Sequence, residues 1–205
     1  MKLTTMFSLL RKKPEKHAIT YAVLLCASTL ALLASFQLSL DKQHIAEHPE
    51  AGLSCSINAI LNCASVMKTP QASLFGFPNS WLGLTGFSVL LFVAIAGLTG
   101  TRFSRNTWRF LAIGVFFALC FAFWLFFDSV YVIQVLCPWC LAMTTSTIII
   151  ASAVAHIVLA EDIFFKSNQK IRVKLENQYG ILATALVICL GAVLVYSKFG
   201  NALFN

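Results

Sequence analysis

Long stretches of the chain carry no charged side chain, and this feature constrains the fold more than any other. No Lys, Arg, Asp or Glu lies within residues 18–40, 69–101 or 177–197, and Asp128 is the only one within residues 110–160. An uncharged apolar run of about 20 residues is the length that crosses a bilayer. Only 11% of the 205 residues are charged and 59% are hydrophobic. These values exclude a soluble globular domain, a disordered chain and a small secreted disulfide scaffold.

The uncharged runs predict an all-α, polytopic membrane protein with five membrane-spanning helices. Their expected bounds are residues 18–38, 80–98, 108–131, 140–159 and 181–196. The first run is long and lacks a small-residue cleavage site at its end, so we interpret it as an anchor and not as a signal peptide.

The Lys and Arg residues of the connecting segments predict the orientation of these helices. Twelve of the fifteen lie before the first helix, between the second and third, or between the fourth and fifth; the other three are Lys42, Lys68 and Lys198. The N-terminus is therefore expected in the cytoplasm and the C-terminus outside. The net charge of +7 is then an orientation signal, and no nucleic-acid partner is expected.

The seven cysteines divide into two sets by position. Three lie within predicted helices, where a lone thiol behaves as a small hydrophobic side chain: Cys26, Cys120 and Cys189. The other four lie in the loop after the first helix or at the start of the fourth: Cys55, Cys63, Cys137 and Cys140. All four fall on the predicted outer face, which in a bacterium is oxidising and allows disulfides to persist.

Cys137-Pro-Trp-Cys140 has the spacing of a redox-active pair. Two intervening residues let both sulfurs meet at a helix start, where the helix N-terminus stabilises a thiolate. Pro138 suits the first helical turn, where no backbone N–H is needed. The alternative is half of a zinc site, for which Cys55 and Cys63 could supply the other ligands.

Cys55 and Cys63 are separated by seven residues. In a continuous helix they would lie about 12 Å apart, whereas a disulfide needs Cα atoms within about 7 Å. Either the segment folds back on itself, or each thiol exchanges with another partner. A structural loop disulfide is the simpler alternative.

The predicted topology limits where electrons from these thiols can go. All four candidate cysteines share one face, and the chain has neither a Gly-rich dinucleotide fingerprint nor a Cys-x-x-Cys-His haem signal. The electron acceptor must then be dissolved in the lipid bilayer, and a quinone, ubiquinone or menaquinone, is expected.

Two segments carry a resemblance to a known family. Residues 54–83 read SCSINAILNCASVMKTPQASLFGFPNSWLG, and residues 137–145 read CPWCLAMTT. Both resemble the vitamin K epoxide reductase family, with the loop cysteines preceding the Cys-x-x-Cys of the fourth helix. The resemblance covers residues 10–160 and implies a four-helix bundle around a quinone, capped by the loop. Bacterial members oxidise a thioredoxin-fold partner and pass the electrons to membrane quinone.

The resemblance implies a role for each cysteine. Cys55 would exchange with the partner, Cys63 would attack Cys137, and Cys140 would transfer electrons to the quinone. Some relatives carry the partner as a fused domain beyond a fifth helix. Since this chain ends at Asn205, a separate periplasmic, DsbA-type partner of thioredoxin fold is expected.

Further side chains are candidates for the quinone site. Asn79 matches the family residue that hydrogen-bonds a quinone carbonyl, although it could instead cap the second helix. Thr144 stands where the animal enzymes carry a Tyr, which argues against vitamin K specificity. Phe75, Phe77, Trp81 and Trp139 could wall the quinone ring or be interfacial aromatics. Asp128 is a candidate proton relay, with a structural role as the alternative.

These expectations give a domain organisation and a function. The chain would comprise a cytoplasmic segment (1–17), a catalytic core (18–160) with a periplasmic loop (39–79), a cytoplasmic loop (161–178) and a fifth helix with a short tail (179–205). The expected function is that of a quinone-dependent thiol oxidase of the bacterial cytoplasmic membrane, which supports disulfide formation. The alternatives are a vitamin K epoxide reductase, and a non-enzymatic membrane protein with structural or zinc-binding cysteines.

Overall fold

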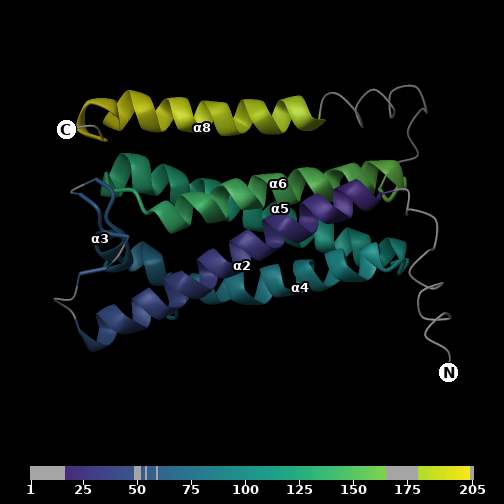
Figure 1. The fold of residues 1–205 in the computed structure, drawn as a ribbon, viewed down its shortest axis with the longest axis horizontal. Coiled ribbons are helices and arrows are strands. Elements are labelled where there is room, and N and C mark those ends of the chain that lie inside the picture. Colours follow the sequence, from purple (N-terminus) through teal and green to yellow (C-terminus); the bar gives the residue numbers. More distant parts are fainter. Residues whose placement is uncertain (1–16, 49–51, 54, 59, 165–179, 204–205) are drawn as a thin grey trace, which may run out of the picture.

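The part of the chain that the structure describes contains five long helices. They run side by side in alternating directions (Figure 1). The structure is a computed structural model that describes residues 17–48, 52–53, 55–58, 60–164 and 180–203. The long helices are α2 (Ala18–Glu47), α4 (Ser80–Leu98), α5 (Arg105–Phe127), α6 (Pro138–Ala160) and α8 (Gly180–Leu203). Helix α2 packs against α4 and α6, and α6 also packs against α5 and α8. Each helix, α5 together with its continuation to Ile133, is long and apolar enough to cross a membrane. The prediction of an all-α, multi-pass membrane protein is therefore confirmed.

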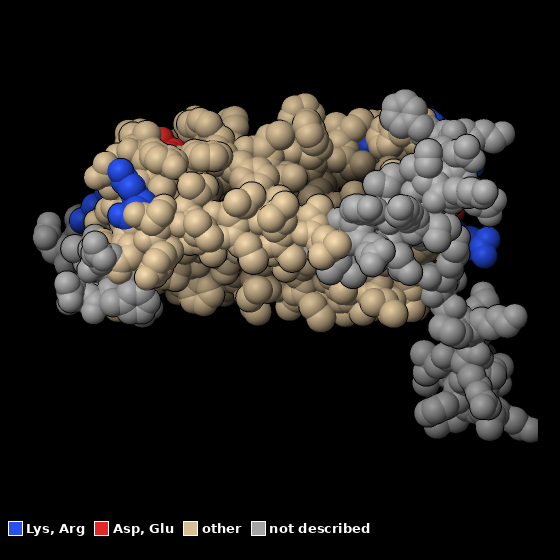
Figure 2. All heavy atoms as spheres, turned by 90° about the horizontal axis from the view of Figure 1, so that it is seen from above, with Lys and Arg blue, Asp and Glu red and all other residues tan. Residues whose placement is uncertain are grey.

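The distribution of charge agrees with this conclusion. Figure 2 shows Lys, Arg, Asp and Glu side chains near the two ends of the molecule, with an uncharged band between them. Ionisable side chains are costly in the hydrocarbon core of a bilayer, so the band is the part that the membrane would surround.

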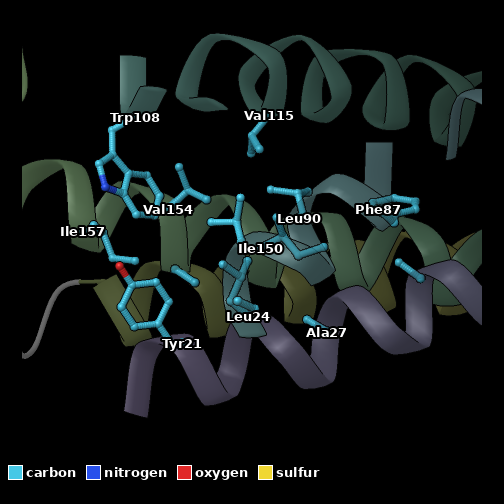
Figure 3. Close-up of a cluster of buried hydrophobic side chains, with 14 of the residues drawn as sticks. Tyr21, Leu24, Ala27, Phe87, Leu90, Trp108, Val115, Ile150, Val154 and Ile157 are labelled. Atoms are coloured by element: carbon cyan, nitrogen blue, oxygen red, sulfur yellow. The ribbon is translucent and has the colours of Figure 1, made fainter. Parts of the chain in front are cut away.

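The buried core of the bundle lies among α2, α4, α5 and α6. Figure 3 shows Leu24 of α2, Leu90 of α4, and Ile150 and Val154 of α6 directed toward one another. Membrane helices gain little from hydrophobic burial and associate through close packing. Such packing is seen where the ring of Tyr21 lies against Gly97, leaving no room for a Cβ atom.

Helix α2 is nine residues longer than the sequence predicts, ending at Glu47 instead of Leu38. The first charges after the uncharged run mark the end of the membrane segment but not of the helix, because no Gly or Pro interrupts the chain before Pro49. Leu38, Asp41 and Ile45 are buried, and their spacing places them on one helix face. The first part of the predicted loop 39–79 is therefore helical.

The other membrane helices begin and end within a few residues of their predicted bounds, except at two ends. Helix α5 ends at Phe127 and continues as a π-helix, η2 (Asp128–Ile133), which ends at Gln134 with a left-handed φ of 57°. Such π-helical turns are frequent at functional sites. Helix α8 extends to Leu203, seven residues beyond the predicted end.

The loop between α2 and α4 covers one end of the bundle (Figure 1). It contains the short helix α3 (Cys63–Met67) and a 3-10 turn, η1 (Pro70–Ser73). The three cysteines expected inside membrane helices are exposed on the surface of the bundle, so they face the surrounding lipid and do not pack in the core: Cys26, Cys120 and Cys189.

Candidate functional site

Two cysteine pairs meet where the loop covers the bundle. Cys55 and Cys63 form a disulfide with their Cα atoms 5.7 Å apart, so the loop folds back between them. The Sγ atom of Cys137 lies 3.2 Å from the Sγ atom of Cys63. Cys63 is 0% exposed and Cys137 is 1% exposed. The two pairs are thus in direct contact, shielded from water.

A short backbone pairing fixes this contact. Leu61 and Leu136 form an isolated parallel β-bridge, and the N–H of Asn62 donates a 2.9 Å hydrogen bond to the carbonyl of Leu136. Cys63 and Cys137 follow the bridge within two residues. The bridge therefore sets the loop cysteine and the α6 cysteine beside each other.

Asn62 also starts the short helix that carries Cys63. Its side-chain oxygen accepts a 3.0 Å hydrogen bond from the N–H of Ser65, which caps α3. The hydroxyl of Ser56 donates to the same oxygen at 3.0 Å. The capped helix holds Cys63 rigidly at its first position.

Helix α8 packs against the residues of the bridge. Phe199 forms a buried cluster with Leu136 and Val130, against which Leu61 and Val195 also pack. The fifth helix therefore contacts the segment that joins the two cysteine pairs.

The Cys-x-x-Cys pair lies at the start of α6. Cys137 is the N-cap residue and Pro138 occupies the first helical turn, as the sequence predicts. The pKa of Cys137 is lowered, chiefly by a hydrogen bond from the Cys140 thiol and also by the backbone N–H groups of Cys140 and Trp139. Burial and the negative charge of Asp41 oppose this effect. The site favours a thiolate at Cys137, the form that takes part in disulfide exchange.

A cavity of about 1040 Å³ lies between α4, α5 and α6 beneath the loop. Its walls are mostly apolar, with Leu and Phe the most frequent side chains, and it extends from Cys140 at the loop end to Phe110 near the opposite end of α5. Six residues predicted for the quinone site or the thiol pair line it: Phe75, Asn79, Asp128, Cys137, Cys140 and Thr144. An elongated apolar cavity with a few polar groups is typical of a small-molecule site.

The side chain of Asn79 bridges two backbone groups of the loop that covers this cavity. It occupies the N-cap position of α4, but its side chain makes no capping hydrogen bond. Instead its amide nitrogen donates to the carbonyl of Gln71 at 2.6 Å, and its oxygen accepts from the N–H of Leu74 at 3.3 Å. One amide proton of Asn79 remains for a ligand in the cavity.

Asp128 and Thr144 supply further polar atoms to the cavity. The Oδ2 atom of Asp128 is buried and has no hydrogen-bond partner among the described residues. Buried carboxylate oxygens are nearly always hydrogen-bonded, so a ligand or a water molecule is expected to donate a hydrogen bond to this atom. The hydroxyl of Thr144 donates to the carbonyl of Cys140 at 3.0 Å, which leaves its oxygen as an acceptor.

Of the four predicted aromatic residues, only one lines the cavity. Phe75 lines the cavity, and its ring lies 6.2 Å from that of Phe121. Phe77 and Trp81 are not in the lining; their rings stack on each other at 6.1 Å, and Trp81 is 53% exposed. Trp139 packs instead against the buried cluster around the loop cysteines.

A metal site would bring at least three ligands together. Within the described part of the chain, no three His, Cys, Asp or Glu side chains are placed to hold a metal ion. Cys55 and Cys63 are joined to each other, so in this state they are not available as ligands for zinc.

A family model matches residues 22–155, which carry both cysteine pairs and helices from α2 to α6. The chain belongs to the vitamin K epoxide reductase family. This is an oxidoreductase family that acts on quinones and thiols. The search of curated proteins finds no match to the chain. Helix α8 lies outside the residues that match the vitamin K epoxide reductase model.

Asp41 and Lys42 are two charged residues at the site that the sequence places in a solvated loop. The Oδ2 atom of Asp41 lies 3.7 Å from the Sγ atom of Cys55. Lys42 lines the cavity, and its Nζ atom donates a 2.5 Å hydrogen bond to the carbonyl of Met67. The sequence after Leu38 contains no helix breaker before Pro49. This feature could have predicted that both residues belong to the last turns of α2.

Proposed function

We propose that this vitamin K epoxide reductase family member is a quinone-dependent thiol oxidase. It reoxidises a disulfide-forming partner of thioredoxin fold and passes the electrons to membrane quinone. The observation that carries the proposal is the contact between Cys63 and Cys137, whose sulfurs lie 3.2 Å apart. This contact links the loop disulfide to the pair that reaches the apolar cavity.

The exchange steps follow the order of the contacts. A partner thiolate attacks Cys55, which breaks the Cys55–Cys63 disulfide, and the second partner thiol completes its own oxidation. Cys63 then attacks the Cys137–Cys140 disulfide at Cys137 and releases Cys140. Attack of Cys55 on Cys63 restores the loop disulfide and releases Cys137. Two electrons have then moved from the partner to the α6 pair.

The cavity suits a quinone. Its volume of about 1040 Å³ is at the upper end of the range for small-molecule sites, and its length along α5 would accommodate an isoprenoid tail. A quinone bound there would accept two electrons and two protons. Cys140 lines the wall of the cavity and would pass electrons to it, Asn79 and Thr144 would orient it through hydrogen bonds, and Asp128 would relay protons to it.

The sidedness of the membrane supports an oxidising role. Most Lys and Arg residues lie in the segments at the other end of the bundle, which supports a cytoplasmic position for that end and a periplasmic position, in a bacterial inner membrane, for the cysteine end. Disulfides persist in that compartment, where secreted proteins acquire them. The partner is therefore expected to be a periplasmic protein.

Quinone absorbance provides the test. The purified protein is mixed with a reduced thioredoxin-fold oxidase and a short-chain ubiquinone or menaquinone, and the loss of quinone is followed. Wild-type protein should consume quinone and oxidise the partner in equal amounts, whereas Cys140→Ser should do neither. A Cys120→Ser variant is the matched control, because Cys120 lies on the lipid-facing surface. Quinone loss that is equal in wild type and Cys140→Ser would overturn the proposal.

A further inference from the structure

A buried carboxylate lies beside the loop disulfide. Asp41 is 7% exposed and belongs to the part of α2 that extends beyond the membrane run. Its Oδ1 atom accepts a 2.8 Å hydrogen bond from Gln37, and its Oδ2 atom lies 3.7 Å from the Sγ atom of Cys55.

The disulfide state leaves the second oxygen of this carboxylate facing a sulfur that has no proton to donate. Burial of a carboxylate is costly unless its oxygens are hydrogen-bonded. Reduction of the disulfide changes this contact, because a Cys55 thiol can donate to Oδ2. The arrangement therefore suits a group that receives a proton from Cys55.

We propose that Asp41 is the proton acceptor for Cys55 in the exchange between the two cysteine pairs. The inference rests on the proposed function and adds a catalytic residue to it. In the mixed disulfide, Cys63 is bonded to Cys137 and Cys55 is a thiol. The carboxylate of Asp41 takes the proton from Cys55 as its sulfur bonds to Cys63. The bond between Cys63 and Cys137 breaks, and its electron pair leaves on the Cys137 thiolate.

The proton and the electrons are both accounted for. The oxidant is the Cys137–Cys140 disulfide, which the proposed quinone reaction regenerates. The proton on Asp41 passes to water at the loop surface before the next cycle. Thiol exchange requires a thiolate nucleophile, and Asp41 supplies one at the moment of attack.

The charge on Asp41 also acts on the leaving group. The negative carboxylate raises the pKa of Cys137, which means that it disfavours a thiolate there. Neutralising Asp41 by a proton removes this repulsion in the same step that releases the Cys137 thiolate. Proton transfer and bond breaking therefore favour each other.

Other ionisable groups near Asp41 enter the pH dependence of the exchange. The loop contributes Cys55 and Cys63, which is bonded to it; the start of α6 contributes Cys137, on which the charge of Asp41 acts, and Cys140 beside it. On α2 itself, Lys42 is bound to the carbonyl of Met67, and the ring of His44 packs against that of His48.

Asp41→Asn tests the inference, because it keeps the shape of the side chain and removes its basicity. The variant and wild type are mixed with a reduced thioredoxin-fold oxidase and a short-chain ubiquinone. Partner oxidation at neutral pH should fall about 100-fold, within the range that a positioned acid–base group contributes. The deficit should shrink as the pH rises toward 9, since Cys55 then ionises without help. Asp41→Glu should recover part of the rate.

A second readout distinguishes proton transfer from general damage to the fold. Since the slowed step is the release of Cys137, the disulfide between Cys63 and Cys137 should accumulate in Asp41→Asn. It is measured by mass spectrometry of acid-quenched, unreduced protein. Glu47→Gln is the matched control, because it makes the same chemical change on an exposed residue of α2. It should leave both the rate and the mixed disulfide unchanged.

The outcomes separate this inference from the proposed function. Wild-type protein that consumes no quinone contradicts the proposed function itself. Active wild-type protein overturns only the role of Asp41 if Asp41→Asn keeps the wild-type rate, or if its deficit is the same at every pH and no Cys63–Cys137 disulfide accumulates.

Discussion

The Sγ atom of Cys63 lies 3.2 Å from the Sγ atom of Cys137, while Cys63 is already bonded to Cys55. Cys63 therefore belongs to the loop pair and is also in contact with the α6 pair. The proposed transfer from the loop to α6 needs no large movement of either segment, because the attacking sulfur and its target are already in contact.

The shared position of Cys63 predicts the site of partner attachment. In Cys63→Ala, a partner sulfur that becomes bonded to Cys55 should persist, because no neighbouring loop thiol can displace it. A thioredoxin-fold probe that keeps only its exposed cysteine, activated with a small thiol, should form a covalent adduct at Cys55. Peptide mass spectrometry locates the adduct. Cys55→Ser should give none, and an adduct found mainly at Cys137 would contradict the proposed order.

The hydrogen bond from Cys140 predicts the pH dependence of Cys137 in reduced protein. This bond is the largest cause of the lowered pKa of Cys137. Thiolate is then present below the usual thiol range and is lost as the pH falls through the lowered pKa. In Cys140→Ala the pKa should rise, so alkylation of Cys137 by iodoacetamide should slow near pH 7 and recover at higher pH. The rates are measured by peptide mass spectrometry. Identical pH profiles for the two proteins would show that Cys140 does not stabilise the thiolate.

Phe199 of α8 should influence the exchange between the pairs. Its truncation in Phe199→Ala removes a buried side chain that packs on Leu136 and loosens the β-bridge. Small misplacements of reacting groups are costly, so we expect partner-driven quinone reduction to fall about tenfold. Reduction of quinone driven by a dithiol small enough to enter the cavity and reach the α6 pair at Cys140 should change little. Tyr196→Ala is the matched control, since Tyr196 is 67% exposed. Equal losses in both assays would mean that Phe199 only stabilises the fold.

Two glycines of α4 should respond differently to the same substitution. A Cβ atom at Gly97 would overlap the ring of Tyr21, whereas at Gly86 it would meet no atom within 4 Å. Gly97→Ala should destabilise the bundle by about 1–3 kcal/mol through overpacking. Gly86→Ala should be neutral or stabilising, because Ala favours helix by up to about 1 kcal/mol relative to Gly. Thermal unfolding in detergent measures both. A lower melting temperature for Gly86→Ala than for Gly97→Ala would contradict this account of the α2–α4 contact.

The sequence predicts the membrane helices well, since each must contain an apolar run of about 20 residues to cross a bilayer. The start of α4 is predicted to the residue at Ser80, and the family follows from the motifs around the cysteines. Asp41 was missed because a charge ends a membrane run without ending a helix. The bridge between Leu61 and Leu136 was also missed, since two hydrogen bonds between distant segments leave no periodic pattern in either one.

Tertiary contacts, and not residue type, determine which of the predicted residues line the cavity. Phe75 and Phe77 are alike in sequence, yet only Phe75 lines the cavity. The two rings stack 6.0 Å apart across a turn at Gly76, which has a positive φ of 80°, so that only one of them borders the cavity. Asn79 shows the same limit. Its position before α4 predicts a cap, but the side chain bonds to the backbone of Gln71 and Leu74.

The isolated bridge between Leu61 and Leu136 makes the contact between the two cysteine pairs depend on the position of the loop. Because the backbone that forms the bridge also carries Cys63 and Cys137, lifting the loop by a few ångströms would separate the sulfurs and interrupt the proposed electron transfer. Disulfide exchange between the loop pair and the α6 pair would then stop, although every cysteine remains chemically unchanged. A molecule that binds the loop could therefore stop the proposed reaction without touching a thiol or entering the cavity.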